Sequence, residues 1–130
     1  MSDADEFLRK ALECLAGADD EYANRRFNNC ANRSYYACFH AALAALIATG
    51  YRAMGGQWSH VAVQAEFTKR FINRTKASPA EFRDTLLKNM ELRHMADYDV
   101  ESVSEITAAR ALRRARAFVT AVANEQVRRR

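Results

Sequence analysis

A single proline and only four glycines occur in 130 residues, and this scarcity limits the folds that the chain can adopt. Folds built from many short strands need these residues in their turns, whereas long helices exclude them from their interiors. Apolar residues also recur at spacings of three and four, which is the periodicity of one helix face. The sequence therefore predicts an all-α protein, and its length predicts a single domain over residues 1–130.

Five segments with helical periodicity predict an up-and-down bundle of about five helices. The first has its apolar stripe on Leu8, Ala11, Leu12, Leu15, Ala18 and Tyr22. The second is apolar nearly all round, as expected for a central helix, and should stop at Gly50. The predicted helices cover residues 3–22, 27–49 and 59–73, a fourth stretch from Ser78 to Asp97, and a fifth that follows residues 102–105.

Serines mark the predicted starts of the last three helices. Ser59 is placed to cap the third helix, and Ser78 stands before Pro79 at the start of the fourth. Ser102 and Glu105 have the spacing of a capping box for the fifth. The segment from Met54 to Trp58, which contains two consecutive glycines, is predicted to be a loop.

Charge is distributed in blocks along the chain, whose formal net charge is +4. Residues 1–21 carry a net charge of −5, whereas residues 110–130 contain seven arginines and one acidic residue. Four of these arginines fall opposite the apolar stripe of the last helix and are predicted to face solvent: Arg110, Arg113, Arg114 and Arg116. Phosphate binding by this helix is the lesser alternative.

Several classes of protein are excluded by what the sequence lacks. The cysteines Cys14, Cys30 and Cys38 are odd in number and form no C-x-x-C pair, so we expect reduced thiols rather than disulfides or a zinc site. The acidic start is unlike a signal peptide, and the nearly uncharged run 34–51 is interpreted as a buried helix rather than a membrane span. We expect a cytoplasmic protein without metal or cofactor.

The second predicted helix places polar side chains in an otherwise apolar stretch. Arg33 and His40 are seven positions apart, within about 20° on the helical wheel, and Tyr36 lies beside them. A buried arginine needs a carboxylate or access to the surface, and Asp97 is the predicted partner of Arg33. Such a pair would fix the second helix against the fourth, whereas a local pair between Arg93 and Asp97 would contribute little.

Two histidines have simpler interpretations than catalysis. His40 is more often a core histidine with satisfied hydrogen bonds than a base. His60, at a predicted helix start, is more often a surface or capping residue. Neither histidine has the helical spacing to another histidine that a metal site requires.

Residues 32–42, N-R-S-Y-Y-A-C-F-H-A-A, and residues 93–99, R-H-M-A-D-Y-D, resemble the HEPN family, the higher eukaryote and prokaryote nucleotide-binding domain. The resemblance is to the branch with R-x-Y-Y-A and A-D-Y-D motifs. It implies a prokaryotic homodimer, often encoded beside a minimal nucleotidyltransferase as a toxin–antitoxin-like pair. The residues it implies for nucleotide, RNA or phosphate binding are Arg33, Tyr36, His40, Arg93, Asp97 and Tyr98.

Some members of the family are metal-independent ribonucleases that use an R-x4-6-H motif. After Arg93 the corresponding positions hold Tyr98, Asp99 and Val100, whereas Arg33 and His40 satisfy the spacing on a different helix. We therefore expect a binding partner rather than an enzyme. Two alternatives remain open: a ribonuclease toxin with candidate catalytic residues Arg33, His40, Arg93 and Tyr98, and a purely structural dimerisation module.

Overall fold

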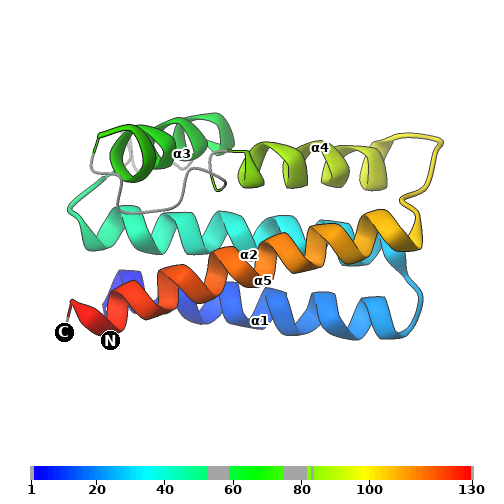
Figure 1. The fold of residues 1–130 in the computed structure, drawn as a ribbon, viewed down its shortest axis with the longest axis horizontal. Helices are drawn as coiled ribbons and strands as arrows, with labels where there is room; N and C mark the ends of the chain where they lie inside the picture. The colour runs from blue at the N-terminus through cyan, green and yellow to red at the C-terminus, as the bar shows by residue number, and fades with distance from the viewer. Residues whose placement is uncertain (1, 53–58, 75–81, 83, 130) are drawn as a thin grey trace.

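The computed structural model describes residues 2–52, 59–74, 82 and 84–129, and within these ranges the chain is helical without strands (Figure 1). This confirms the predicted all-α bundle. The elements in chain order are α1 (Asp3–Ala23), α2 (Phe27–Ala48), α3 (His60–Phe67), the π-helix η2 (Thr68–Arg74), α4 (Thr85–Tyr98) and α5 (Glu105–Arg128).

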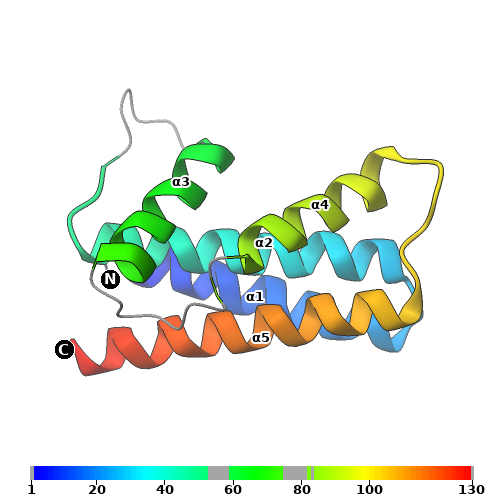
Figure 2. The same ribbon diagram turned by 45° about the horizontal axis from the view of Figure 1, so that its top comes forward.

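The apolar helix α2 is the centre of the bundle. Figures 1 and 2 both show α3 and α4 following one another along one side of α2, with α1 and α5 along the other side. Small residues of α2 such as Ala37, Ala41 and Ala44 are completely buried, which lets the neighbouring helices approach closely. Among the described residues, the largest side chains that are almost completely buried are Tyr35, Phe67, Phe118 and Leu43.

The predicted helix ends are confirmed at two places. The Ser59 hydroxyl accepts a hydrogen bond from the Ala62 N–H at 3.3 Å, as an N-cap does. The second helix ends at Ala48, and Gly50 follows with a φ of +93°, a left-handed conformation that favours glycine. The helix that Ser59 starts continues from α3 into η2, which together cover the predicted range.

The predicted cap of the last helix is wrong by two residues. Ser104, rather than Ser102, caps α5 and accepts from the Thr107 N–H at 3.2 Å. The preceding residue Val103 is buried, and its N–H donates to Asn28 Oδ1 of α2 at 2.8 Å. The chain is therefore tied to α2 before α5 begins, which moves the helix start past Ser102.

Two further predictions fall on residues that lie outside the described ranges: the loop at 54–58 and the helix start at Ser78 and Pro79. The described part of α4 begins at Thr85. On α1 the predicted stripe is narrower than expected, because Leu12 is 48% exposed while Ala11 and Leu15 are buried. One turn of α1 thus presents its apolar residues to both core and solvent.

The three cysteines are free thiols, with Cys30 and Cys38 buried and Cys14 partly buried. Burial raises the pKa of the Cys38 thiol to about 12, so this side chain stays neutral. None of the described helices is long and apolar enough to cross a membrane.

Candidate functional site

Aromatic side chains of α2 meet rings from α1 and α3 on one side of the bundle. His60 of α3 stacks on Phe39, with ring centroids 4.4 Å apart, and its Nδ1 shares a short hydrogen bond with the Tyr35 hydroxyl. Phe7 of α1 stacks on His40 at 5.8 Å. The prediction of His60 as a surface or capping residue is therefore wrong, because its ring packs into this aromatic cluster.

Two arginines lie against the tyrosines of this cluster. The guanidinium carbon of Arg33 is 5.2 Å from the ring centroid of Tyr36, and that of Arg93 is 5.9 Å from the same centroid. Arg93 is also 5.4 Å from the ring centroid of Tyr35. These distances are those of cation–π contacts, so Tyr36 contacts two positive charges that come from α2 and α4.

Asp97 and Arg33 do not contact each other directly; the side-chain amide of Asn32 lies between them and is hydrogen-bonded to both. Asn32 Nδ2 donates to Asp97 Oδ2 at 2.9 Å, and Arg33 donates to Asn32 Oδ1 from Nε at 2.9 Å and from Nη2 at 2.5 Å. The predicted Arg33–Asp97 ion pair is therefore wrong, because Asn32 lies between the two groups. An amide has both a donor and an acceptor, so it links the cation to the carboxylate and still joins α2 to α4.

The ion pair between Arg93 and Asp97 is loose. Arg93 Nη1 lies 3.8 Å from Asp97 Oδ2, and the side chains are 15% and 29% exposed. Arg93 Nε and His40 Nδ1 are buried and have no hydrogen-bond partner in the described structure. His40 is thus not the fully satisfied core histidine that the sequence suggested, and the site retains unused hydrogen-bonding capacity.

Burial keeps the two imidazoles of the site neutral. It is the largest influence that lowers the pKa of His40, and the charges of Lys10 and Arg33 lower it further. Burial and the charge of Arg93 likewise lower the pKa of His60. At neutral pH the positive charge of the site therefore belongs to its arginines.

Tyr98 lies at the edge of the site and is 67% exposed. Its ring centroid is 5.9 Å from the guanidinium carbon of Arg93 and 5.0 Å from the ring centroid of His94. The structure thus brings Arg33, Tyr36, Arg93 and Tyr98 into one series of contacts. His40 joins this series through Tyr36, with ring centroids 6.3 Å apart.

Sequence reasoning assigned no role to Asn32 and missed the contacts of His60. Asn32 stands directly before Arg33, and its amide could have been considered as a partner for that charge. His60 carried no comparable signal, because its ring contacts come from a helix more than twenty residues earlier in the chain. Among the described residues, no three His, Cys, Asp or Glu side chains gather as a metal site would require.

A second polar contact joins α4 to α5. Asn89 is completely buried, and its Oδ1 accepts from Arg114 Nε at 3.0 Å and from Nη2 at 2.8 Å. Its Nδ2 donates to the Ala111 carbonyl at 3.3 Å. The prediction that Arg114 faces solvent is therefore wrong, because α4 partly covers it, whereas Arg110, Arg113 and Arg116 are exposed as predicted.

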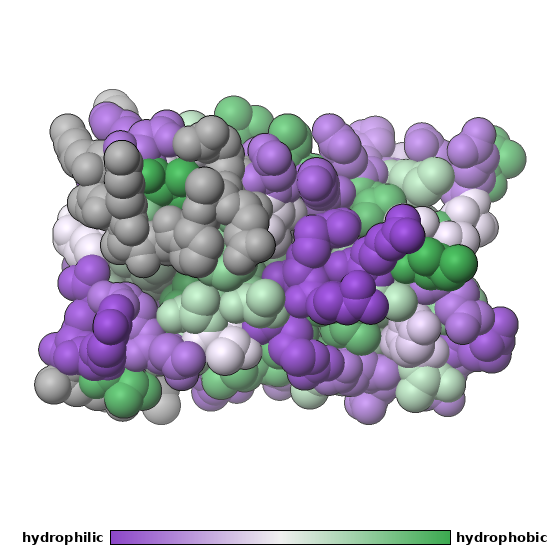
Figure 3. All heavy atoms as spheres, in the orientation of Figure 1, coloured by the Kyte–Doolittle hydropathy of each residue, from purple (hydrophilic) through white to green (hydrophobic). Residues whose placement is uncertain are grey.

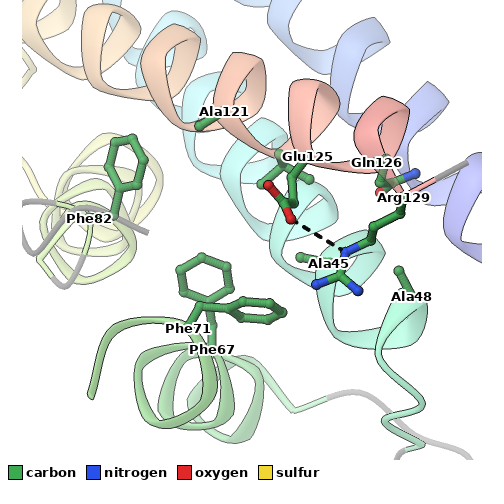
Figure 4. A pocket seen from close by; sticks show the side chains of 10 residues that line it. Ala45, Ala48, Phe67, Phe71, Phe82, Ala121, Glu125, Gln126 and Arg129 are labelled. Carbon is green, nitrogen blue, oxygen red and sulfur yellow. Dashed lines mark ion pairs between the residues drawn. The ribbon is translucent and has the colours of Figure 1, made fainter. Parts of the chain in front are cut away.

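An apolar cavity of about 60 Å³ lies where η2, α2 and α5 meet (Figure 4). Phe67, Phe71 and Phe82 form one wall, and the ion pair between Glu125 and Arg129 lies at the other. Small-molecule pockets usually have volumes of about 300–1,000 Å³. This cavity is too small for such a ligand, and we interpret it as a gap in the packing.

The chain matches the model of a known protein family. A family model described as the HEPN domain matches residues 4–126. This range includes the motifs at residues 32–42 and 93–99 and the polar contacts of Asn32 and Asn89. No curated protein matches the chain.

Proposed function

Because the chain belongs to the HEPN family, we propose that it binds a nucleotide or RNA where Arg33, Tyr36 and Arg93 meet. Membership of this family supports a role related to nucleotides or RNA. The finer part of the proposal is that a homodimer of this chain is the partner of a minimal nucleotidyltransferase in a toxin–antitoxin-like system.

One observation supports binding at this place above all: Tyr36 contacts two guanidinium groups, and in the described structure only that of Arg93 has a carboxylate within ion-pair distance, Asp97 at 3.8 Å. Asp97 shares its charge between Asn32 and a loose contact with Arg93, so the site carries an excess of positive charge. Guanidinium groups bind phosphate oxygens through paired hydrogen bonds. Aromatic rings beside them offer a surface for a nucleobase.

The exposed ring of Tyr98 extends this surface away from the core. It lies against Arg93, so a base stacked on Tyr98 would place its phosphate near that guanidinium. Tyr36 is only partly buried and holds Arg93 from the other helix. The site thus combines a fixed cation with an accessible ring, as expected for a nucleotide rather than for a bare anion.

Calorimetric titration with AMP, ATP and a short single-stranded RNA tests the proposal. Arg93→Gln should weaken the binding of any of these ligands by at least about tenfold, because it removes a charge-assisted contact with phosphate. Arg9→Gln is the matched control, since Arg9 is an exposed arginine whose partner is Glu6 on α1. Equal affinities for the two variants, or no binding by a folded wild-type chain, would refute the assignment of this site.

The proposed partner needs a separate experiment. The open reading frame next to the gene should encode a minimal nucleotidyltransferase, and the two purified proteins should co-elute in size-exclusion chromatography. Light scattering of the chain alone should give the mass of a dimer. A monomer that binds neither the neighbouring protein nor a nucleotide would contradict this part of the proposal.

Ribonuclease activity is the alternative that Arg33 and His40 support, because both contact Tyr36 and the imidazole is neutral. A neutral imidazole can accept a proton from a ribose hydroxyl. However, the buried Nδ1 of His40 and the absence of histidine at positions 98–100 favour binding over cleavage. RNA that is degraded without metal by the wild type, but not by His40→Ala, would establish the alternative.

A purely structural module is the third reading. In that case the chain would show no detectable binding of nucleotides or RNA. Asn32→Ala would still weaken the contact between α2 and α4. The titration described above distinguishes this reading from the other two.

A further inference from the structure

Basic side chains from α4 and α5 line a groove that takes no part in the site described above. The groove encloses about 300 Å³, and its lining residues are Phe82, Thr85, Lys88, Arg113, Arg114 and Ala117. Figure 3 shows hydrophilic side chains gathered between α4 and the first half of α5 on this face. Arg110 is close enough to Arg114 for its charge to contribute to lowering the pKa of that arginine, after the larger effect of burial.

None of the three cations that line the groove has an ion-pair partner within the described structure. Lys88, Arg110 and Arg113 form no ion pair there, in contrast to Arg116, which pairs with Asp19 of α1. The acidic residues nearest to Lys88 in sequence are Asp84, the N-cap of α4, and Glu91, and neither lines the groove.

The most buried of the cations is held by a neutral group. Arg114 donates two hydrogen bonds to the amide oxygen of Asn89, at the place where an aspartate would have neutralised it. Cys38 beneath them is a neutral thiol, since burial raises its pKa to about 12. The fold therefore fixes a guanidinium in place without reducing its charge, and the repulsion among neighbouring cations remains.

We propose that the groove between α4 and α5 binds the phosphodiester backbone of an RNA strand, at a place distinct from the Arg33–Arg93 site. The choice of RNA as the polyanion rests on the proposed function. Arg113 and Arg114 line the groove, and Arg110 precedes them on α5 by three and four positions, so the three form a cluster of charges for phosphates.

The groove suits a backbone rather than a base. Phe82 is its only aromatic lining residue and is 7% exposed, so the described lining presents no open ring on which a base can stack. Contacts with phosphates alone carry no sequence information and depend strongly on salt. The groove is therefore expected to add affinity for longer strands, and to add none for a mononucleotide.

Fluorescence anisotropy with labelled oligouridylates of increasing length, at several salt concentrations, measures whether the groove adds affinity for longer strands. The double variant Lys88→Gln/Arg113→Gln removes two exposed charges and leaves the Asn89–Arg114 contact intact. It should weaken the binding of a long oligouridylate by roughly tenfold at low salt. It should also reduce the slope of log affinity against log salt by about 1.4, since each phosphate contact on a single strand contributes about 0.7.

Two controls make the result specific. Arg116→Gln removes a charge of the same kind from α5, but that arginine is paired with Asp19 and does not line the groove, so it should affect binding far less. The affinity of the double variant for AMP should equal that of the wild type. Circular dichroism should show unchanged helix content in both variants.

The outcomes separate this inference from the proposed function. If AMP does not bind but long oligouridylates bind through Lys88 and Arg113, the proposed nucleotide site fails and the groove is supported. If the double variant binds long strands with the affinity and salt slope of Arg116→Gln, the groove proposal is overturned. Competition by polyglutamate that equals competition by RNA would also overturn it, since the partner would then be an acidic protein.

Discussion

Two asparagine–arginine pairs in this molecule have the same local geometry and different surroundings. Asn32 accepts two hydrogen bonds from Arg33, and Asn89 accepts two from Arg114, in each case from Nε and Nη2. The amide nitrogen of Asn32 then donates to the carboxylate of Asp97, whereas that of Asn89 donates to a backbone carbonyl. One arginine is thus linked to a negative charge, and the other is not.

The difference shows what the amide contributes in each place. Between α2 and α4, Asn32 links the Arg33 guanidinium to the Asp97 carboxylate, which are not in direct contact, and the three side chains are partly exposed. Between α4 and α5, the completely buried Asn89 fixes the direction of Arg114 and leaves its charge uncompensated. We therefore expect the first pair to serve mainly as a link between helices, and the second to present a cation at the groove.

Asn89→Leu should have the largest effect on stability. It leaves the partly buried guanidinium of Arg114 without its acceptor, and we expect the free energy of unfolding to fall by about 3 kcal/mol. Urea unfolding followed by circular dichroism at pH 7 measures this loss.

The double variant Asn89→Leu/Arg114→Leu provides the control. Replacing both polar partners by apolar groups removes the unpaired charge, so much of the lost stability should return. A double variant that is less stable than Asn89→Leu would contradict the view that the unpaired guanidinium causes the loss.

Asn32→Ala should have an intermediate effect, because it breaks the contacts with Arg33 and with Asp97 together. We expect the free energy of unfolding to fall by about 2 kcal/mol, which is less than for a buried pair because these groups are partly exposed. Arg33→Ala should cost only about 1 kcal/mol, since Asp97 keeps its contacts with Asn32 and Arg93. Urea unfolding of both variants ranks them, and a greater loss for Arg33→Ala would favour a direct Arg33–Asp97 pair.

The comparison also marks the limit of what the sequence predicted. The helices could be predicted from apolar periodicity, because a helix that buries one face has apolar residues at spacings of three and four. The approach of Arg33 to Tyr36 followed in the same way, from their spacing on α2. The predicted link between α2 and α4 exists, although the group that makes it is Asn32 rather than Arg33.

The roles of Asn89 and Arg114 did not follow from the sequence. Arg114 lies on the polar side of the helical wheel of α5, and only the position of α4 beside it makes it partly buried. That position depends on how the two helices pack, which spacing within either helix does not determine. The same holds for His60, whose partners Tyr35 and Phe39 belong to another helix.

The stability of the aromatic site should depend on pH through its two histidines, with a smaller effect than those above. Burial lowers the pKa of His40 and of His60 in the folded chain, so in mild acid the unfolded chain binds more protons than the folded one. Stability should therefore fall as pH decreases from 7 through the ordinary histidine pKa of about 6.5. Urea unfolding between pH 7.5 and about 5 measures the slope, and His40→Gln should reduce it.

The smallest effect on stability is expected for substitutions in the groove, and these should increase stability instead of lowering it. Lys88 and Arg113 are exposed cations with no ion pair in the described structure, so Lys88→Gln/Arg113→Gln relieves repulsion instead of breaking a contact. We expect stability in urea to rise by a few tenths of a kcal/mol at low ionic strength. The gain should vanish at about 1 M salt, where the screening length is about 3 Å. Arg116→Gln, which breaks a pair with Asp19, should lower stability slightly under the same conditions. A loss of stability in the Lys88/Arg113 variant would mean that these charges are balanced, and the contrast between the two asparagine–arginine pairs would then be lost.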